Sequence, residues 1–249
     1  MMTALPQTLP LWPPVLATRG PGVRSASHAH HALHLVVRLA GELRFRSGTT
    51  RWIRAAGVVT GPDVKHEIDG TGGDVLLVFV DPESDVGAAM VPVVGVGCRA
   101  ISGAERARLD VERSPLELMG EAGPGWTRGV VAALGGTSPA PRAMHPRVRR
   151  ALRLIRERPP DGDASLTALA GAVGLSPSRF MHVFTESVGV PLRPYLAWLK
   201  LQRAAVAVVA GMPLTRAAHA AGFADAAHMT RTFRRMFGNL PSAMQQRTP

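Results

Sequence analysis

Residues 165–189, SLTALAGAVGLSPSRFMHVFTESVG, decide the fold of the C-terminal part of this chain, because they read as two helical segments joined by a glycine. Ser165 can cap a first short helix, and Gly174 can supply a tight turn after it. Ser176 followed by Pro177 is a typical beginning of a second helix. Two short helices joined by a glycine-containing turn predict a helix-turn-helix unit.

A second copy of the pattern follows in residues 214–238, LTRAAHAAGFADAAHMTRTFRRMFG. One helix is predicted up to about Ala221, then a turn at Gly222 and a second helix capped by Asp225. Between the two units, residues 193–210 can form one continuous helix of about 27 Å. A rigid helix of that length can hold two recognition helices about one DNA turn (~34 Å) apart, so that both enter successive major grooves.

Positive charge is concentrated in the same part of the chain. The protein has 249 residues and a formal net charge of +11. From His145 onward there are 15 Lys and Arg but only 5 Asp and Glu, whereas residues 1–144 are nearly neutral. A basic domain beside a neutral one is typical of a protein that binds phosphate backbones, and we favour nucleic acid over an anionic membrane.

The residues from Arg147 to Met244 resemble the AraC/XylS family of bacterial transcription regulators. The resemblance is carried by GLSPSRFMHVF, GVPLRPYL, AGFAD and RTFRRMFGNLPS, in this order and spacing. It implies an all-α DNA-binding domain over residues 147–249, with helix-turn-helix units at about 165–187 and 214–237 joined by a long helix. It also implies that the protein regulates transcription by binding specific DNA sequences.

The resemblance further implies that the outward face of each second helix reads DNA, while aromatic and methionine side chains such as Phe180 and Phe233 face inward. The residues placed toward DNA are Ser178, Arg179, Met181, His182 and Thr185 in the first unit, and Ala227, His228, Arg231, Arg234 and Arg235 in the second. Arg231 is the strongest candidate for a base contact, since arginine can form two hydrogen bonds with guanine. Arg179, Arg203, Arg234 and Arg235 are expected at phosphates.

The N-terminal part has a different pattern. Short β-branched and aromatic runs separated by glycine-containing turns fill residues 22–80 and predict a small sandwich or barrel. Ser102 to Glu105 predicts a capping box, with helical segments after it. Residues 135–146, GGTSPAPRAMHP, predict a linker. We therefore predict two domains, α+β overall: a cupin-like β-barrel with following helices in residues 1–134, then the all-α DNA-binding domain.

The stretch SHAHHALH, residues 27–34, contains four histidines, and a fifth follows at His66. Regulators of this family commonly carry a cupin-like domain, and residues 22–41 and 57–66 resemble the two cupin motifs. The resemblance implies a candidate constellation of His28, His30, His34 and His66. Neutral imidazoles suit a divalent transition metal such as Zn, Cu, Fe or Ni. An organic-effector pocket lined by these histidines and a purely structural role remain alternatives.

The spacing of these histidines argues against a simple strand. In an extended chain His28 and His30 share one face about 7 Å apart, whereas His34 lies about 20 Å from His28 unless the chain bends. His31 is expected to face the other way. Elemental analysis of the protein and of its histidine variants distinguishes a metal site from the two alternatives.

Together these features predict a transcription regulator, not an enzyme, that binds double-stranded DNA in response to a small effector, a metal ion being one candidate. We expect a homodimer, with RNA polymerase as a further partner, and a location in the cytoplasm, since the single cysteine, Cys98, and the absence of a long apolar run speak against secretion and membrane insertion. Two alternatives are a cupin-type metal-dependent enzyme with an accessory basic domain and an architectural DNA-binding protein without an effector.

Overall fold

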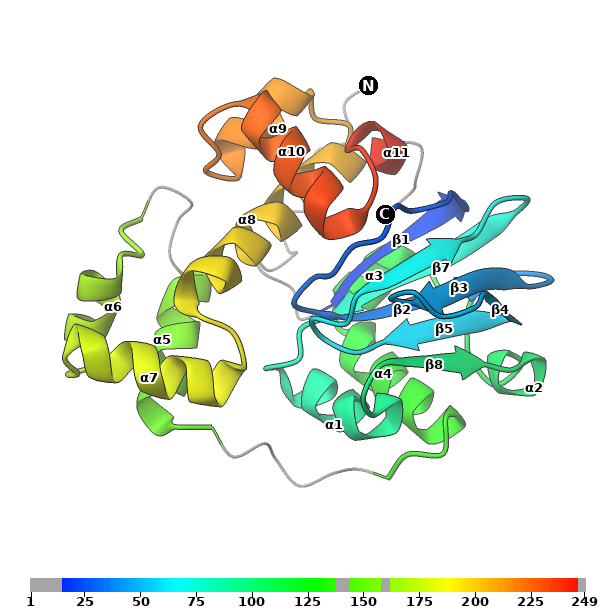
Figure 1. The fold of residues 1–249 in the computed structure, drawn as a ribbon, viewed down its shortest axis with the longest axis horizontal. Helices are drawn as coiled ribbons and strands as arrows, with labels where there is room; N and C mark the ends of the chain where they lie inside the picture. The colour runs from blue at the N-terminus through cyan, green and yellow to red at the C-terminus, as the bar shows by residue number, and fades with distance from the viewer. Residues whose placement is uncertain (1–14, 138–143, 158–161, 246–249) are drawn as a thin grey trace.

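The computed structural model describes residues 15–137, 144–157 and 162–245 (Figure 1). An N-terminal region of antiparallel strands and short helices is followed by a C-terminal region made of helices, as predicted. None of the helices in the described ranges combines the length and the apolar character that a membrane crossing requires.

The strands form two antiparallel sheets rather than one closed barrel. The larger sheet has the order β1-β7-β2-β5-β8, with β1 at Val15–Pro21, β7 at Asp74–Val80, β2 at Leu33–Arg38, β5 at Gly57–Thr60 and β8 at Cys98–Ile101. The smaller sheet has the order β4-β3-β6, with β4 at Ile53–Ala55, β3 at Leu43–Ser47 and β6 at His66–Asp69. Strand β1 was not among the predicted strands. Its loop to β2 runs alongside β6, through isolated bridges at Arg24 and His28.

The apolar residues of the two sheets face each other and form a small core. Leu43 and Phe45 alternate with Arg44 along β3, so that one face is buried and the other carries charge. Every residue of β2 is buried, because this central strand is covered on both faces. Its second face packs against helices, as expected for a strand that reads as a continuous apolar run.

Three helices cover the larger sheet: α1 at Asp85–Val94, α3 at Pro115–Met119 and α4 at Ala122–Ala133, while the short α2 at Gly103–Arg106 follows the end of β8. The predicted capping box is present, since Ser102 and Glu105 exchange side-chain and backbone hydrogen bonds at the start of α2. Helix α1 was not predicted, and it contains Pro92, a residue that normally argues against a helix interior.

The C-terminal helices agree closely with the prediction. They are α5 at Pro146–Glu157, α6 at Leu166–Ala172, α7 at Pro177–Val188, α8 at Leu192–Val209, α9 at Leu214–Ala220, α10 at Ala226–Phe237 and α11 at Ser242–Gln245. Gly174 and Gly222 make the two turns with φ of 68° and 80°, a backbone region that favours glycine. The predicted linker, residues 135–146, includes positions 138–143, which lie outside the described residues.

Helix α8 is the axis of the C-terminal region. Figure 1 shows α5, α6 and α7 at one end of it and α9, α10 and α11 at the other, with the sheets alongside. Its 18 residues correspond to about 27 Å. Tyr195 and Trp198, on its first half, are fully buried and touch the N-terminal region, where Trp198 packs on Phe79 of β7. The two helix-turn-helix units are therefore fixed to one rod that is itself packed against the sheets.

Candidate DNA interface and histidine cluster

The second helix of each unit, α7 and α10, has one buried and one exposed face. Phe180 and Phe184 of α7 and Phe233 of α10 are completely buried. All ten predicted DNA-contacting residues of these two helices are exposed, namely Ser178, Arg179, Met181, His182 and Thr185 on α7 and Ala227, His228, Arg231, Arg234 and Arg235 on α10. This arrangement follows from the helical period, which separates positions i and i+4 from the positions between them.

Side-chain caps fix where the two helices begin. Ser176 accepts a hydrogen bond from the N–H of Arg179 at the start of α7, and Asp225 accepts one from the N–H of His228 at the start of α10. The backbone N–H of His228 holds the pKa of Asp225 below its usual value. Both helices end at a glycine with positive φ, Gly189 after α7 and Gly238 after α10.

The four predicted histidines meet at one point of the N-terminal region, and we call His28, His30, His34 and His66 the histidine cluster. One ring nitrogen from each lies within 4.8 Å of the others, and all four side chains are buried. His28 and His66 form a two-way backbone bridge, so they stand directly opposite each other, with ring centroids 4.2 Å apart. The chain bends at His31 and Ala32, which returns His34 to within 6.5 Å of the His28 ring.

The bend brings His34 close to the other histidines, although their spacing in an extended strand would keep them apart. Instead of lying about 20 Å away, as in an extended strand, the Nδ1 atom of His34 is 3.3 Å from Nε2 of His30 and 3.3 Å from Nε2 of His66. Nitrogen ligands at about 2.0–2.1 Å from a tetrahedral Zn²⁺ are about 3.3–3.4 Å from one another. These two distances therefore match the spacing that a shared ion requires.

Backbone carbonyl groups set which ring nitrogens carry protons. Nδ1 of His28 donates to the carbonyl of Ala26, and Nδ1 of His66 donates to the carbonyl of Val64, both at 2.8 Å. In the neutral rings Nε2 then bears the lone pair. Nε2 of His28 is buried without any hydrogen-bond partner. Histidines that ligate metals usually have this arrangement, in which one ring nitrogen is anchored to a carbonyl and the other points into the site.

Burial keeps these rings neutral. It lowers the pKa of His28 and lowers the pKa of His66 to about 3, and nearby His28 adds to the effect on His66. The pKa of His30 is also lowered, first by burial and then by the neighbouring imidazoles. A neutral imidazole is the form that binds a metal ion, so the donor set fits a divalent transition metal.

Aromatic rings from both regions surround the cluster. Phe79 of β7 stacks on His34 with 4.3 Å between ring centroids, and Trp198 of α8 stacks on His30 at 5.4 Å. Beside the cluster lies an apolar cavity of about 50 Å³, whose walls include His28, His34, Phe233 and Phe237. The cluster and the cavity are therefore formed jointly by the sheets and by the C-terminal helices.

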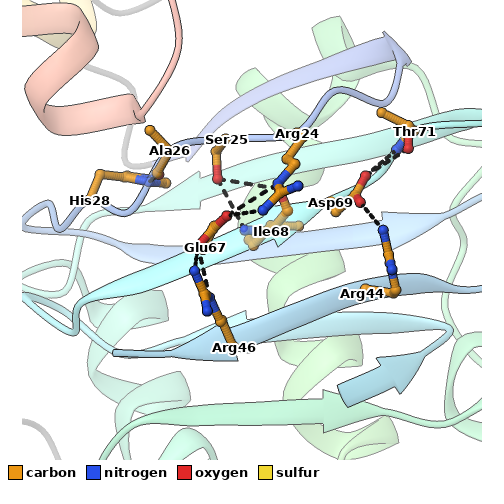
Figure 2. Close-up of polar contacts among 10 residues, drawn as sticks. All are labelled: Arg24, Ser25, Ala26, His28, Arg44, Arg46, Glu67, Ile68, Asp69 and Thr71. Atoms are coloured by element: carbon orange, nitrogen blue, oxygen red, sulfur yellow. Dashed lines mark hydrogen bonds and ion pairs between the residues drawn. The ribbon is translucent and has the colours of Figure 1, made fainter. Parts of the chain in front are cut away.

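Ion pairs hold the segment before His28 against β6. Glu67 accepts hydrogen bonds from Arg24 and Arg46, as Figure 2 shows. Ser25 bonds Ile68 through both its backbone N–H and its hydroxyl. These contacts align the segment with β6 and so place His28 opposite His66. The repeated Arg–acid pairs were not identified from the sequence as part of the site.

A second group of buried charges lies where the sheets meet α5 and α8. His31, which faces away from the cluster as predicted, is hydrogen-bonded to Asp63 and Glu83. Although burial lowers its pKa, these two carboxylates raise the pKa of His31 to about 9. Arg156 of α5 pairs with Asp81 and donates to the Tyr195 hydroxyl at 3.2 Å. No local pattern predicts this group, because its hydrogen-bonded partners are 32 to 75 residues apart in the sequence.

Sequence similarity to known families and proteins lies in the C-terminal region. Residues 169–247 match a family model described as a helix-turn-helix domain. Over 108 residues the chain is 31% identical to the arabinose operon regulatory protein of Escherichia coli strain K12, and equally to that of Salmonella typhimurium. The matching part is 40% of this chain and spans 36% and 37% of the length of these two relatives.

Similarity of fold extends over nearly the whole chain. The structure of ToxT from Vibrio cholerae superimposes with a TM-score of 0.57, covers 94% of this chain and 98% of ToxT, and shares 10% sequence identity. A structure of wild-type ToxT bound to an unsaturated fatty acid, from Vibrio cholerae strain SCE256, gives a TM-score of 0.56 at 9% identity, with 93% and 94% of the two chains covered. This likeness shows a shared two-part architecture.

Proposed function

We propose that the protein is a sequence-specific DNA-binding transcription regulator of the AraC type, because its C-terminal region matches a helix-turn-helix family model and resembles the arabinose operon regulatory proteins. The observation that carries the proposal is that α7 and α10 sit on one rod, α8, with all ten predicted contact residues exposed. The positive charge of this region supplies the attraction to phosphates. A protein of this kind acts where the DNA is, which supports a place in the cytoplasm.

The two recognition helices have different surfaces. On α10, Arg231, Arg234 and Arg235 are exposed, so this helix can combine a base contact with phosphate contacts. On α7, the exposed Ser178, Met181 and Thr185 are shorter or uncharged, and suit hydrogen bonds and contacts with thymine methyl groups. We infer that most of the sequence discrimination by charged groups comes from α10.

We further propose that the N-terminal region holds a small effector and that the effector is a divalent transition metal ion at the histidine cluster. Nε2 of His28 and of His66, Nε2 of His30 and a ring nitrogen of His34 would be the ligands. Four imidazoles without a thiolate favour Zn, Cu, Ni or Co over Mg or Ca. A bound ion would supply a cross-link between β2, β6 and the loop that joins β1 to β2.

An organic effector is the second candidate. The apolar cavity beside the cluster could accept one, but its volume of about 50 Å³ is well below the roughly 300–1,000 Å³ of typical small-molecule pockets. In this arrangement of the domains the cavity is large enough only for a few atoms. The metal ion therefore fits the site better.

A cupin-type metal-dependent enzyme remains the alternative function. Such an enzyme needs a coordination position open to substrate and usually a general base close by. The histidine cluster is buried under Trp198 and Phe79, and the group of potential ligands found there consists of four histidines. Incubation of the metal-loaded protein with candidate substrates would support the enzyme only if turnover depended on the histidines.

A DNA selection experiment tests the proposed regulator. Full-length protein is mixed with a pool of random duplexes, bound sequences are recovered over several rounds, and the affinities of selected and scrambled duplexes are compared over a salt series. A regulator should prefer the selected site by at least about 1,000-fold and lose affinity steeply with salt. If no sequence is enriched, with or without added Zn²⁺, the proposal is wrong.

The expected partners follow from the same proposal. A homodimer would bring four recognition helices to the DNA, so the selected site should contain two half-sites. Contact with RNA polymerase would then place the regulator beside a promoter. Sedimentation of the protein with the selected duplex measures how many copies bind.

A further inference from the structure

We propose that a metal ion held by the histidine cluster fixes α10, the second recognition helix, against the sheets and thereby increases the affinity of the protein for its DNA site. The inference rests on the proposed function, because it requires a specific DNA site. It is carried by two sets of contacts that link ligands of the ion to α10 and α8.

The first contact runs through Ala26. The N–H of Ala26 donates a hydrogen bond of 2.9 Å to the carbonyl of Gly238, the residue that caps the C-terminal end of α10. The carbonyl of the same Ala26 accepts the hydrogen bond from Nδ1 of His28. Figure 2 shows His28 and Ala26 beside the helical C-terminal segment. One peptide residue therefore connects a ligand ring to the end of a recognition helix.

Gly238 is packed so tightly that only glycine fits. A Cβ atom on Gly238 would lie 2.4 Å from the carbonyl oxygen of Ala26 and 2.6 Å from Nδ1 of His28. Gly189 has the equivalent place at the end of α7, also with a positive φ, yet a Cβ atom there would meet nothing within 4 Å. The close approach is thus a property of the contact between α10 and the histidine cluster, not of helix termination.

The second contact is aromatic. The His30 ring stacks on Trp198 of α8 with an interplanar angle of 25°, and Phe237 of α10 lies 5.7 Å from Trp198 and 6.3 Å from His30 between ring centroids. Because all three side chains are at most 6% exposed, moving α10 away would expose them and would remove Phe237 from beside the His30 ring. The ring positions needed for an ion therefore depend on the docked helices.

The docked arrangement leaves the predicted DNA-contacting face of α10 accessible. Arg231, Arg234 and the other predicted contact residues of α10 point to solvent while its C-terminal end is fixed. An ion that binds the docked arrangement more tightly shifts the protein toward it. DNA then meets recognition helices whose relative orientation is already restricted, so less conformational entropy is lost on binding. By linkage, DNA must raise the affinity for the ion by the same factor.

The test uses full-length protein stripped of metal, the duplex obtained by selection, and Zn²⁺ as the probe. In the wild type Zn²⁺ should lower the Kd for the duplex about tenfold, within the usual range of coupling between sites. Gly238→Ala should reduce the effect to less than about twofold. Gly189→Ala, which also places an alanine at a positive φ at the end of a recognition helix but without a clash, should respond like the wild type.

Two additional measurements keep the result interpretable. Co²⁺ absorption reports metal binding separately, and the selected duplex should tighten Co²⁺ binding about tenfold in the wild type. Phe237→Leu leaves all four ligands and Gly238 in place, and it should weaken the response to Zn²⁺ by removing aromatic contact. A full wild-type response in both Gly238→Ala and Phe237→Leu would overturn the inference, and so would a loss of DNA affinity on adding Zn²⁺ to the wild type.

The two proposals can fail separately. If the pool yields no preferred duplex, the regulator proposal fails. If a duplex is selected and its Kd in the wild type is the same with and without Zn²⁺, the regulator stands and only the coupling is wrong.

Discussion

The ring nitrogens of His28 and His66 illustrate how single atoms determine the chemistry of this protein. Each ring uses Nδ1 to bond a backbone carbonyl, which leaves Nε2 as a lone-pair donor toward the centre of the cluster. Burial lowers the pKa of both rings, so neither is protonated near neutral pH. The carbonyl of a residue two positions earlier thus decides which nitrogen faces an ion.

His66→Gln tests the cluster at this scale. Glutamine keeps a polar side chain of similar size but removes the imidazole nitrogen, so we expect bound Zn²⁺ to fall from one ion per chain to a small fraction of that. Elemental analysis after gel filtration measures the stoichiometry. His219→Gln is the control, since His219 is exposed on α9 and should leave the metal content unchanged. Equal metal content in the two variants would contradict the site.

Arg231→Ala tests the reading of bases. The side chain is exposed on α10, and loss of a two-bond contact to guanine should cost about 1–3 kcal/mol and relax the preference at one position of the site. Binding to the selected duplex and to its single-base variants measures both effects. Arg128→Ala removes the same charge from the exposed face of α4 and should change neither. Uniform weakening across all duplexes would instead place Arg231 at a phosphate.

At the scale of the element, short helices such as α6 and α7 depend on their ends. Isolated helices of seven to twelve residues are marginal in water, so caps and packing must hold them. Ser165, Ser176 and Asp225 each accept a hydrogen bond from a backbone N–H in the first turn that would otherwise lack a partner. The caps could be predicted from the sequence because each one depends only on a local residue pattern.

Ser176→Ala should therefore destabilise the protein by about 1 kcal/mol, the usual cost of losing an N-cap. Chemical denaturation followed by circular dichroism measures the free energy of unfolding. Ser178→Ala makes the same chemical change two residues later, at an exposed position without a capping bond, and should stay within about 0.5 kcal/mol of the wild type. Equal stabilities of the two variants would show that the cap contributes little.

At the scale of the whole molecule, buried charges join the sheets to the C-terminal helices. Asp81 follows β7, and Arg156 reaches it from α5 while also bonding Tyr195 of α8. Burial raises the pKa of Asp81, whereas the charge of Arg156 lowers it. The stability of the ion pair is therefore the difference between the attraction of the two charges and the cost of removing them from water. Removing one member leaves the other buried without its counter-charge.

Arg156→Gln should lower the free energy of unfolding by about 3 kcal/mol, because it leaves Asp81 and Glu83 without a cation from α5. It should also increase proteolysis between the sheets and α5. Arg153→Gln, on the exposed face of the same helix, is the matched control. Thermal unfolding and limited proteolysis of both variants measure these changes. Unchanged stability in Arg156→Gln would mean that aromatic packing alone holds the two regions together.

Most residues of the histidine cluster could be predicted from the sequence, but their contacts with the C-terminal helices could not. The four histidines could be grouped because two local motifs contain them. Gly238, by contrast, had no predicted role, and its approach to Ala26 depends on how α10 packs across the sheets. Helix α1 was missed because Pro92 obscures its pattern, although Ser84 caps it and its apolar side is buried.

The sequence by itself determined the paired helix-turn-helix units, the rod between them, the charge of that region and the identity of the clustered histidines. These features depend on residues close together along the chain, where helical period, caps and glycines act locally. Only the tertiary structure decided that a bend returns His34 to His28, that two sheets form instead of one closed barrel, and that Trp198 and Gly238 lie against the histidine cluster. Such contacts depend on burial of apolar surface shared by segments far apart in sequence, which no local pattern records.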